Sequence, residues 1–257
     1  MTLPASLPAN EHRAPATSGI PPDPPLHAIV MAAGEGRRLR PLTERWPKPA
    51  LPLDGRPVIA TVLRQLLEAG CAEVTVVTGH LAERLEALVG DGSAFDLTLR
   101  FARQPEPIGT ADAVSCALAA GAAPPLVVAT ADTVFAAGDV ARFASAFAAS
   151  AAPGAVAVRQ EPPPGPGRAA VDVSAGRVTR IGGTARGPLA HASLWGLDAQ
   201  LARYLEGVDG PPYELATVYQ RAIDDGIDVS AFEVGRTRDL TDPLDLVEEN
   251  FPYLRGI

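Results

Sequence analysis

Short apolar runs alternate along the chain with segments in which apolar residues recur every three or four positions. Residues 27–33 are an apolar run that ends at Gly34, and residues 57–68 carry the apolar stripe of an amphipathic helix before Gly70. Strand, loop and helix in this order predict the opening of a βαβ unit. The same patterns predict further strands at 74–78, 97–101, 126–131, 155–159, 189–197 and 229–234, and further helices at 81–89, 110–120, 138–150, 213–225 and 242–250.

This alternation predicts an α/β fold in which a mainly parallel, Rossmann-like central sheet lies between two layers of helices. Residues 169–173 and 177–181 flank the turn Ser174-Ala175-Gly176, which predicts a β-hairpin. We therefore expect a small β-rich portion beside the main sheet. The expected domain covers residues 26–257, and its ligands should collect at the carboxyl ends of the parallel strands.

Composition changes this picture at one end and excludes two classes of function. Residues 1–25 contain repeated prolines and no basic segment followed by an apolar one, so we expect a disordered Pro/Ala-rich tail and no signal peptide. No uncharged apolar run approaches the roughly 20 residues that span a bilayer, which predicts a soluble, cytoplasmic protein without a membrane partner. A formal net charge of −8 argues against a nucleic-acid partner, because nucleic acids are bound mainly through Lys and Arg.

A glycine-rich, basic loop directly after the first predicted strand is the sharpest sign of chemistry. It reads Ala32-Ala33-Gly34-Glu35-Gly36-Arg37-Arg38-Leu39-Arg40-Pro41-Leu42-Thr43, and Pro47-Lys48-Pro49 follows it. Glycines let backbone N–H groups approach phosphate oxygens, and guanidinium groups bind phosphate through paired hydrogen bonds. An ammonium group can stabilise charge that builds on phosphorus. Spacing alone leaves open the alternative of a solvated basic loop.

The same segment resembles the signature of the NTP-transferase (sugar-phosphate nucleotidyltransferase) superfamily, A-G-G-x-G-T-R-L-x-P-L-T followed by P-K-P. Ala33 stands where a second glycine is usual, and Arg37 stands where threonine is common. The resemblance implies a short, self-contained GT-A-like α/β domain with a nucleotide-binding half at about 26–135 and an acceptor-binding half at about 136–257. It implies that Arg38 and Lys48 are catalytic and contact the reacting phosphates. The implied nucleotide-binding residues of the loop are Ala32, Ala33, Gly34, Glu35, Gly36 and Arg37.

A second stretch, Gln104-Pro105-Glu106-Pro107-Ile108-Gly109-Thr110, resembles the base-reading loop of the family. The resemblance implies that Gln104, Gly109 and Thr110 bind the nucleotide. An amide can pair with a base edge, and glycine lets the backbone close over the base. Thr110 also fits the N-cap of the following helix, and both roles can hold together. The stretch does not distinguish purine from pyrimidine.

Two further segments imply a magnesium site. Asp132 follows the predicted strand 126–131, where family members carry a metal-ligating aspartate, and residues 233–240 resemble the family segment D-x-G-T-x-x-D-L, whose first aspartate completes the site. Glu233 falls on that position. The resemblance therefore implies Asp132 and Glu233 as ligands of Mg²⁺, with Asp239 in reserve because glutamate is one methylene longer than aspartate. Mg²⁺ suits the reaction because a few carboxylates and the substrate phosphates hold it together.

Signals for the acceptor site are weaker. Trp195 lies in a strand that passes beneath the sugar site in relatives, although a core aromatic is an equally good interpretation. Glu214 begins a helix beside a proline-rich loop, where it faces either the acceptor or solvent. Many sugar-specific relatives carry a Glu-Lys pair after the hairpin, but Gly182-Gly183-Thr184-Ala185-Arg186 stands there in this chain. Arg180 or Arg186 would have to substitute for the missing lysine.

The implied reaction is in-line attack by a phosphate oxygen of the acceptor on the α-phosphorus of an NTP, with release of pyrophosphate. A sugar 1-phosphate is the expected acceptor. The missing Glu-Lys pair keeps open a cytidylyltransferase that acts on a non-sugar phosphate or phosphonate, such as a phosphocholine-like acceptor. Glu233 keeps open a non-catalytic nucleotide-sugar sensor. The expected partners are thus an NTP and a phosphorylated small molecule, and a homodimer is also open.

Overall fold

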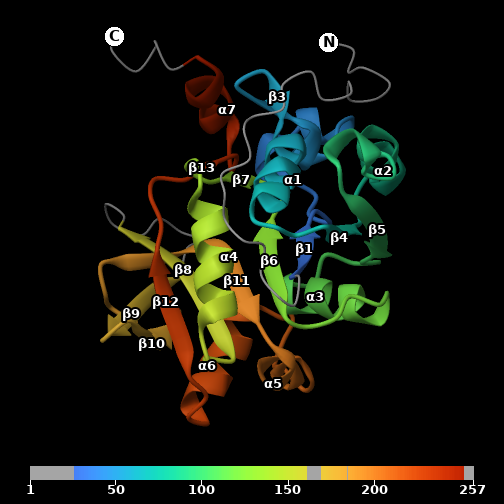
Figure 1. Cartoon of the computed structure of the whole chain (residues 1–257). Helices are drawn as coiled ribbons and strands as arrows, with labels where there is room; N and C mark the ends of the chain where they lie inside the picture. The colour runs from blue at the N-terminus through green and yellow to red at the C-terminus, as the bar shows by residue number, and fades with distance from the viewer. Residues whose placement is uncertain (1–25, 161–168, 184, 252–257) are drawn as a thin grey trace.

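The computed structural model describes residues 26–160, 169–183 and 185–251, and at its centre is a nine-stranded sheet (Figure 1). The tail expected at residues 1–25 lies outside the described residues. The strands run in the order β5-β4-β1-β6-β11-β8-β12-β10-β9. They are β1 (His27–Met31), β4 (Glu73–Thr78), β5 (Thr98–Arg103), β6 (Leu126–Thr130), β8 (Gly154–Gln160), β9 (Ala170–Ser174), β10 (Arg177–Ile181), β11 (Leu189–Leu197) and β12 (Val229–Glu233).

The first half of the chain builds the parallel half of this sheet. β1 pairs in parallel with β4 and with β6, and β4 pairs in parallel with β5. β11 runs antiparallel to β6 and β8, β8 and β12 are parallel, and the predicted hairpin β9–β10 forms one edge. The expectation of a mainly parallel sheet is therefore correct for the first half, whereas in the second half β8–β12 is the one parallel pair among the described strands. β11 follows the hairpin without a crossover helix, and parallel pairing requires such a crossover.

Helices cover both faces of the sheet and divide the core into two clusters. α1 (Val58–Glu68), α2 (Ala82–Val89) and α4 (Asp139–Ala149) bury their apolar sides in the first cluster. α3 (Thr110–Ala119), α5 (Ala199–Ala202) and α6 (Leu215–Asp224) do so in the second. Strand residues alternate between the clusters, as Val30 and Ile29 show, because successive side chains of a strand point to opposite faces. The three predicted layers are confirmed.

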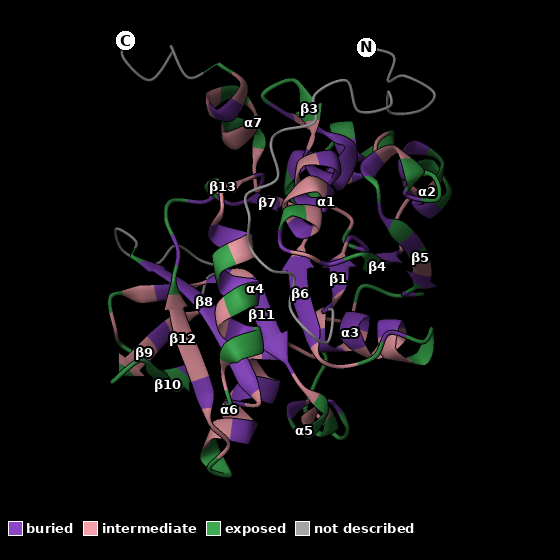
Figure 2. Cartoon of the chain, viewed as in Figure 1, coloured by how far each residue is buried: buried purple, intermediate pink, exposed green. Residues whose placement is uncertain are grey.

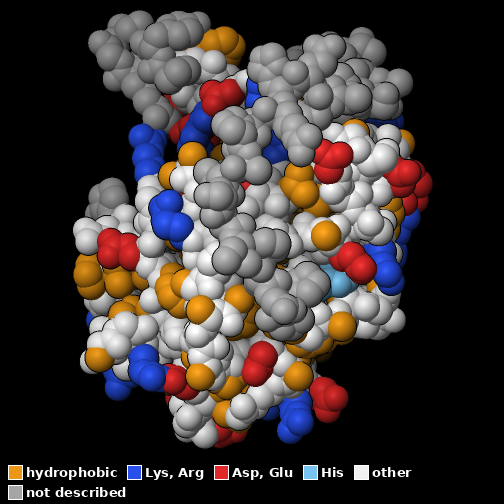
Figure 3. All heavy atoms as spheres, viewed as in Figure 1, with side chains coloured by type: hydrophobic (Ala, Val, Ile, Leu, Met, Phe, Trp, Pro, Cys, Tyr) orange, Lys and Arg blue, Asp and Glu red, His pale blue; other side chains and the backbone are white. Residues whose placement is uncertain are grey.

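Burial follows the position of each strand in the sheet. In Figure 2 the central strands β1, β6, β11 and β8 are largely buried, whereas the hairpin β9–β10 carries exposed residues. Figure 3 shows acidic and basic side chains intermixed over the face that carries α4 and β12. No helix among the described residues has the length and apolar character needed to cross a membrane.

Predicted element positions agree closely with the structure, since every predicted strand and helix in the described residues is present with its ends shifted by a few residues at most. The pattern missed the shortest elements. These are the β2–β3 hairpin (Pro52–Leu53 and Arg56–Pro57), the β7–β13 pair (Thr133–Val134 and Arg238–Asp239), the helix α5 and several single turns of 3₁₀ helix. Elements of two to four residues carry no periodicity that a sequence can reveal.

The last helix, α7 (Pro243–Asn250), is fastened to the β2–β3 hairpin, which follows Lys48 in the chain. Arg238 pairs with Asp54 of the hairpin and with Glu249 of α7, and its Nη2 also donates to the Glu249 carbonyl at 2.7 Å. Asn250 donates to the Pro52 carbonyl at 2.8 Å. These contacts tie the segment after β12 to the loop that carries Lys48.

We expect Arg238→Met to lower the free energy of unfolding by about 1–2 kcal/mol, because two carboxylates and a carbonyl lose one shared donor. The hydrogen bond from Arg238 holds the pKa of Asp54 below its ordinary value, so this stabilisation is present at neutral pH and is lost as the pH falls below about 4. Urea unfolding at pH 7 and pH 3.5 measures both effects. Arg236→Met is the control, since Arg236 is 72% exposed and 3.7 Å from Glu249, and it should change stability by less than about 0.5 kcal/mol. Equal effects of the two variants would contradict the assignment.

Candidate active site

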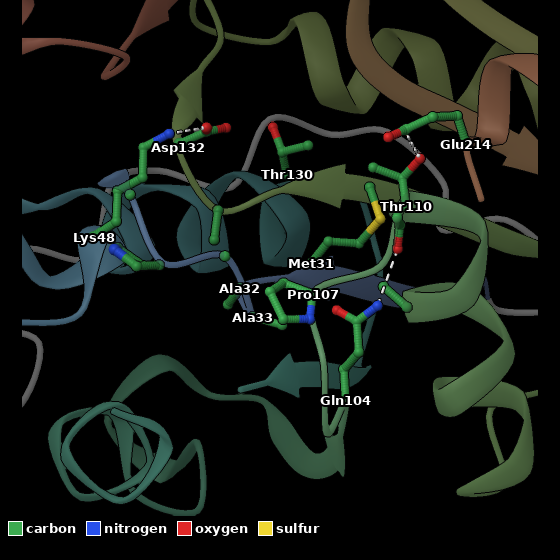
Figure 4. Close-up of a pocket in the computed structure, with 16 residues that line it drawn as sticks. Met31, Ala32, Ala33, Lys48, Gln104, Pro107, Thr110, Thr130, Asp132 and Glu214 are labelled. Carbon is green, nitrogen blue, oxygen red and sulfur yellow. Dashed lines mark hydrogen bonds and ion pairs between the residues drawn. The ribbon is translucent and has the colours of Figure 1, made fainter. Parts of the chain in front are cut away.

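A pocket opens where β1, β5 and β6 end, at the carboxyl edge of the parallel half of the sheet (Figure 4). This is where ligands of α/β sheets collect. Seven of its sixteen lining residues are alanine or glycine, whose small side chains leave the backbone open to a bound molecule. The lining residues are Met31, Ala32, Ala33, Gly34, Gly36, Lys48, Pro49, Gln104, Pro107, Gly109, Thr110, Ala113, Thr130, Ala131, Asp132 and Glu214.

The signature loop after β1 has one conformation that only glycine fits at its turn. Gly36 has φ +62°, and a Cβ there would lie 2.9 Å from Thr43 Cγ2 and 3.2 Å from Lys48 Cβ. The Thr43 hydroxyl donates to the Gly36 carbonyl at 3.0 Å, and Leu39 buries its side chain in the core. The loop is thereby folded back against the segment that carries Lys48.

Residues after β4 support the same loop from below. His80 bonds through Nε2 to the Thr43 carbonyl at 2.7 Å, and its backbone N–H donates to Ala33 O at 3.1 Å. A Cβ on Gly79 would lie 2.8 Å from Ala33 O, so the chain can pass this close only at a glycine. The sequence assigned no role to His80, and the structure shows that it positions the loop.

The three arginines of the loop differ in whether they pair with Glu35. Glu35 accepts from Arg37 Nε at 2.8 Å and pairs with Arg40 at 3.1 Å. The hydrogen bond from Arg37, partly offset by burial, holds the pKa of Glu35 below its ordinary value. Arg38 is exposed, and within the described ranges its guanidinium forms no hydrogen bond or ion pair. Of the three loop arginines, Arg38 is therefore the one with all its donors available to a phosphate.

Lys48 and Asp132 form an ion pair on one side of the pocket (Figure 4). Their side chains are 16% and 32% exposed, so both charges face the pocket and not bulk solvent. Burial raises the pKa of Asp132, but the Lys48 ammonium and hydrogen bonds from Lys48 and neighbouring threonines outweigh burial and bring the pKa below its ordinary value. Lys48 is also the only lysine among the 22 Lys and Arg residues of the chain.

Asp239 reaches the neighbourhood of Asp132 through the β7–β13 pairing. The Thr133 hydroxyl lies 2.9 Å from Asp239 Oδ1 and 3.3 Å from Asp132 Oδ1, and it can donate its one hydrogen to either. Asp239 Oδ2 accepts from the nearly buried Arg159 at 3.1 Å and from Thr237 at 3.0 Å. Asp239 is thus held by Arg159 and Thr237, and it contacts the Thr133 hydroxyl, which also lies near Asp132.

The structure does not bring Glu233 to Asp132, which corrects the expected ligand pair. Glu233 ends β12, is exposed, and accepts from Gln160 at 3.4 Å. β11 and β8 lie between β6 and β12, so the backbones of the two strands are roughly 14 Å apart at about 4.8 Å per strand. The signature-like spacing of residues 233–240 suggested the pairing, but spacing does not report how many strands separate two positions.

The donor set suits a magnesium ion that the substrate helps to bind. Asp132 is the one carboxylate beside Lys48 among the lining residues, and no group of three or more His, Cys, Asp or Glu residues in the described chain could hold a metal. Mg²⁺ is commonly bound by one or two carboxylates together with substrate phosphates and water. Asp132 fits this pattern, and the role of Mg²⁺ stays a prediction.

The opposite side of the pocket joins the base-reading loop to the start of α6. Gly109 has φ +139° and ψ 168°, and a Cβ there would lie 2.5 Å from Tyr213 N and 2.6 Å from Tyr213 C. Tyr213 N donates to Ile108 O and Ala111 N donates to Tyr213 O, both at 2.8 Å. The loop and the segment before α6 are therefore bonded like two strands, which only a glycine at 109 permits.

Thr110 places the carboxylate of Glu214 in the pocket (Figure 4). The Thr110 hydroxyl donates to Glu214 Oε2 at 2.6 Å and accepts from Leu215 N at 2.8 Å. Gln104, which is 3% exposed, lies on the floor between this side and the Lys48 side. Gln104, Gly109, Thr110 and Glu214 thus all line the pocket, and their roles in binding stay predictions.

Two weak acceptor candidates lie elsewhere. Trp195 is 3% exposed, and its ring packs 4.9 Å from the Tyr219 ring and 5.0 Å from the His191 ring, so it is a core residue. Arg186 is exposed outside the pocket and donates to the carbonyls of Gly183 and Ala185. Both expectations are corrected, because a large aromatic on an inward strand position fills the core and a guanidinium in a turn caps nearby carbonyls.

Comparison with known proteins agrees with this geometry. Residues 27–182, more than half of the chain, match the family model described as nucleotidyl transferase. The chain belongs to this family. A match of that extent covers the signature loop, Lys48, the base-reading loop and Asp132, so the predicted superfamily is confirmed.

Individual nucleotidyl transferases match shorter stretches. The chain is 36% identical over 112 residues to N-acetylmuramate alpha-1-phosphate uridylyltransferase of Neisseria meningitidis, which covers 42% of this chain and 48% of that protein. It is 38% identical over 110 residues to CMP-5'-(3-aminopropyl)phosphonate synthase of Streptomyces rubellomurinus, which covers 43% of this chain and 17% of that protein. The matched stretch is thus less than half the length of either curated relative.

A solved structure matches over nearly the whole chain. The crystal structure of a UDP-glucose pyrophosphorylase complexed with UDP-glucose superposes with a TM-score of 0.80 and 17% identity, covering 90% of this chain and 99% of that one. At this identity the likeness establishes the fold, and the GT-A-like α/β prediction is confirmed. Substrates and metal do not follow from it.

Proposed function

We propose that the chain transfers the nucleoside monophosphate unit of an NTP to a sugar 1-phosphate and releases pyrophosphate. The observation that carries the proposal is the arrangement of the pocket. The Lys48–Asp132 pair lies on one side, Glu214 lies on the other, and Gln104 lies on the floor between them. The exposed Arg38 belongs to the loop that follows β1, although it is not itself a lining residue. One side suits phosphates, and the other suits a base and hydroxyl groups. The relative from Neisseria meningitidis is named for such a reaction with a sugar 1-phosphate.

The reaction needs positioning and charge neutralisation more than proton transfer. The acceptor phosphate is already an anion near neutral pH, and one of its oxygens attacks the α-phosphorus as the bond to the pyrophosphate oxygen breaks. Arg38 binds phosphate oxygens, and the Lys48 ammonium stabilises charge that develops around the α-phosphorus. A bound Mg²⁺ would neutralise phosphate charge. Asp132 would hold that ion, and it keeps Lys48 aimed into the pocket when no substrate is present.

We expect pyrophosphate release with Mg²⁺, one NTP and one sugar 1-phosphate, and no release when any of the three is omitted. The assay takes ATP, CTP, GTP, UTP and dTTP against hexose, amino-sugar and N-acetylmuramate 1-phosphates. A Lys48→Met variant provides the blank for contaminating enzymes. Release by the wild type that equals the blank in every combination would overturn the proposal.

A second candidate function is cytidylyl transfer to a phosphonate or another non-sugar phosphate. The printed name of the Streptomyces rubellomurinus relative supports it, and so does the absence of a Glu-Lys pair after β10. The same assay with CTP and phosphocholine or an aminoalkylphosphonate distinguishes it. Release confined to these acceptors would replace the sugar 1-phosphate in the proposal and leave the chemistry at phosphorus unchanged.

A further inference from the structure

The side-chain amide of Gln104, on the pocket floor, is held by two hydrogen bonds within the protein. Its Nε2 lies 2.7 Å from Asp112 Oδ2 and 3.0 Å from Gly109 O. A primary amide nitrogen carries two hydrogens, so both of its donors are used within the protein. The side chain is 3% exposed and lines the pocket, which leaves its carbonyl oxygen as the group that it can offer to a ligand.

The orientation of this amide follows from the chemistry of its two partners. An ionised carboxylate and a backbone carbonyl can only accept hydrogen bonds, so the nitrogen of Gln104 must face Asp112 and Gly109. Turning the amide over would set its oxygen against two other oxygens. Figure 4 shows the bonded nitrogen on the Thr110 side of the amide and the oxygen on the other side.

Asp112 supplies the charged half of this constraint. It lies in the first turn of α3, is half-buried, and also lies 4.0 Å from the Cys116 sulfur. A hydrogen bond to an ionised acceptor is about twice as strong as a neutral one, and it polarises the amide so that the oxygen becomes a better acceptor. A carboxylate in a first helical turn also stabilises the helix start, which is the purely structural explanation for Asp112.

We propose that Asp112 is a positioning residue for base selection: it fixes Gln104 so that the pocket presents a hydrogen-bond acceptor and selects an NTP through an N–H group on its base edge. The inference rests on the proposed function and deepens it. A base that has lost this hydrogen, by one methyl group on a ring nitrogen or two on an exocyclic amino group, offers no hydrogen to Gln104 and binds more weakly. Asparagine at 112 can donate as well as accept and carries no charge, so only the Gly109 carbonyl still orients the amide of Gln104 and the orientation is less strongly fixed.

The test measures nucleotide binding without an acceptor, by calorimetric titration of ATP, CTP, GTP, UTP and dTTP with Mg²⁺. The wild type should prefer one NTP, and its analogue methylated at the base N–H should bind at least about tenfold more weakly, the contribution of one such bond. Asp112→Asn should weaken the preferred NTP about tenfold and bring the five affinities closer together. Asp112→Glu should keep part of the preference.

Ser115→Ala is the matched control. Ser115 lies on α3, as Asp112 does, but its hydroxyl donates to Ala111 O at 3.1 Å and forms no hydrogen bond with Gln104. It should leave all five affinities unchanged. A purely structural role of Asp112 would lower the melting temperature and weaken every NTP by the same factor, and that outcome overturns the inference. Wild-type preference retained in Asp112→Asn also overturns it and leaves the proposed function intact. A wild type that binds no NTP overturns both.

Discussion

Lys48→Met is expected to lower the rate of pyrophosphate release about a thousandfold while the protein keeps its fold, because a positioned charge at the reacting phosphate commonly contributes that much. Methionine keeps the unbranched apolar stem of the side chain, which lies against Gly36, and lacks only the terminal ammonium. The substitution removes the ion pair with Asp132, whose carboxylate is 32% exposed and can be hydrated in its place. Steady-state kinetics and thermal unfolding of both proteins measure the two parts of the prediction.

Lys48→Arg is the charge-retaining control for this prediction. A guanidinium is a broad planar fork and an ammonium is a compact point charge, so arginine should restore only a minor part of the rate at a side chain that is 16% exposed. Arginine stands at every other Lys or Arg position of the chain. A wild-type rate in Lys48→Met would refute a catalytic role for Lys48, and a wild-type rate in Lys48→Arg would show that any positive charge at this position is sufficient.

Because Lys48 is the only lysine of the chain, its role can also be tested without measuring turnover. Lys48 is the only side-chain amine, so reductive methylation can modify one side chain of the protein. We expect NTP with Mg²⁺ to slow that modification, because the ammonium would then contact phosphate. Peptide mass spectrometry reads the extent of methylation, and equal rates with and without NTP would place the phosphates away from Lys48.

The second large effect is expected for Gly109→Ala, which should lower the free energy of unfolding by about 2–4 kcal/mol and reduce kcat/KM by about a hundredfold. The φ of +139° and ψ of 168° at this residue are adopted almost only by glycine. A methyl group would meet the Tyr213 backbone, which cannot turn aside as a side chain can. The base-reading loop would have to separate from the start of α6 and take Thr110 away from Glu214.

Gly176→Ala is the control for Gly109→Ala. Gly176 has φ +76° in the β9–β10 turn, but nothing lies within 4 Å of the position that a Cβ would occupy. It should therefore lose about 1 kcal/mol of stability and no activity. Urea unfolding and saturation kinetics on both substrates compare the variants. A Gly109→Ala protein with the stability and kinetics of the control would show that the contact with Tyr213 is not needed.

The local hydrophobic pattern and the short motifs were sufficient to predict most of the fold and about half of the candidate site. The βα alternation predicted the layers because one-sided burial imposes a period of two on strands and 3.6 on helices. The signature loop, Lys48, Gln104, Gly109 and Asp132 were identified because each belongs to a short contiguous stretch. Such stretches carry their chemistry in neighbouring residues. The pocket lining includes Lys48, Gln104, Gly109, Asp132 and the small residues of the loop, but not Glu35, Arg37 or Arg38.

Contacts between distant segments were decided only by the tertiary structure. Sequence reasoning placed Glu233 ahead of Asp239 within one motif, but the β7–β13 pairing brings Asp239 to Thr133, and two strands separate β12, which ends at Glu233, from β6. Trp195 and Arg186 show the same limit, since burial depends on what packs against a strand or turn. The sequence alone thus determined which groups can act on phosphates and in which class of fold. The order of strands in the sheet decided which of these groups meet, because pairing between segments far apart in the chain follows from packing of the whole sheet and not from local spacing.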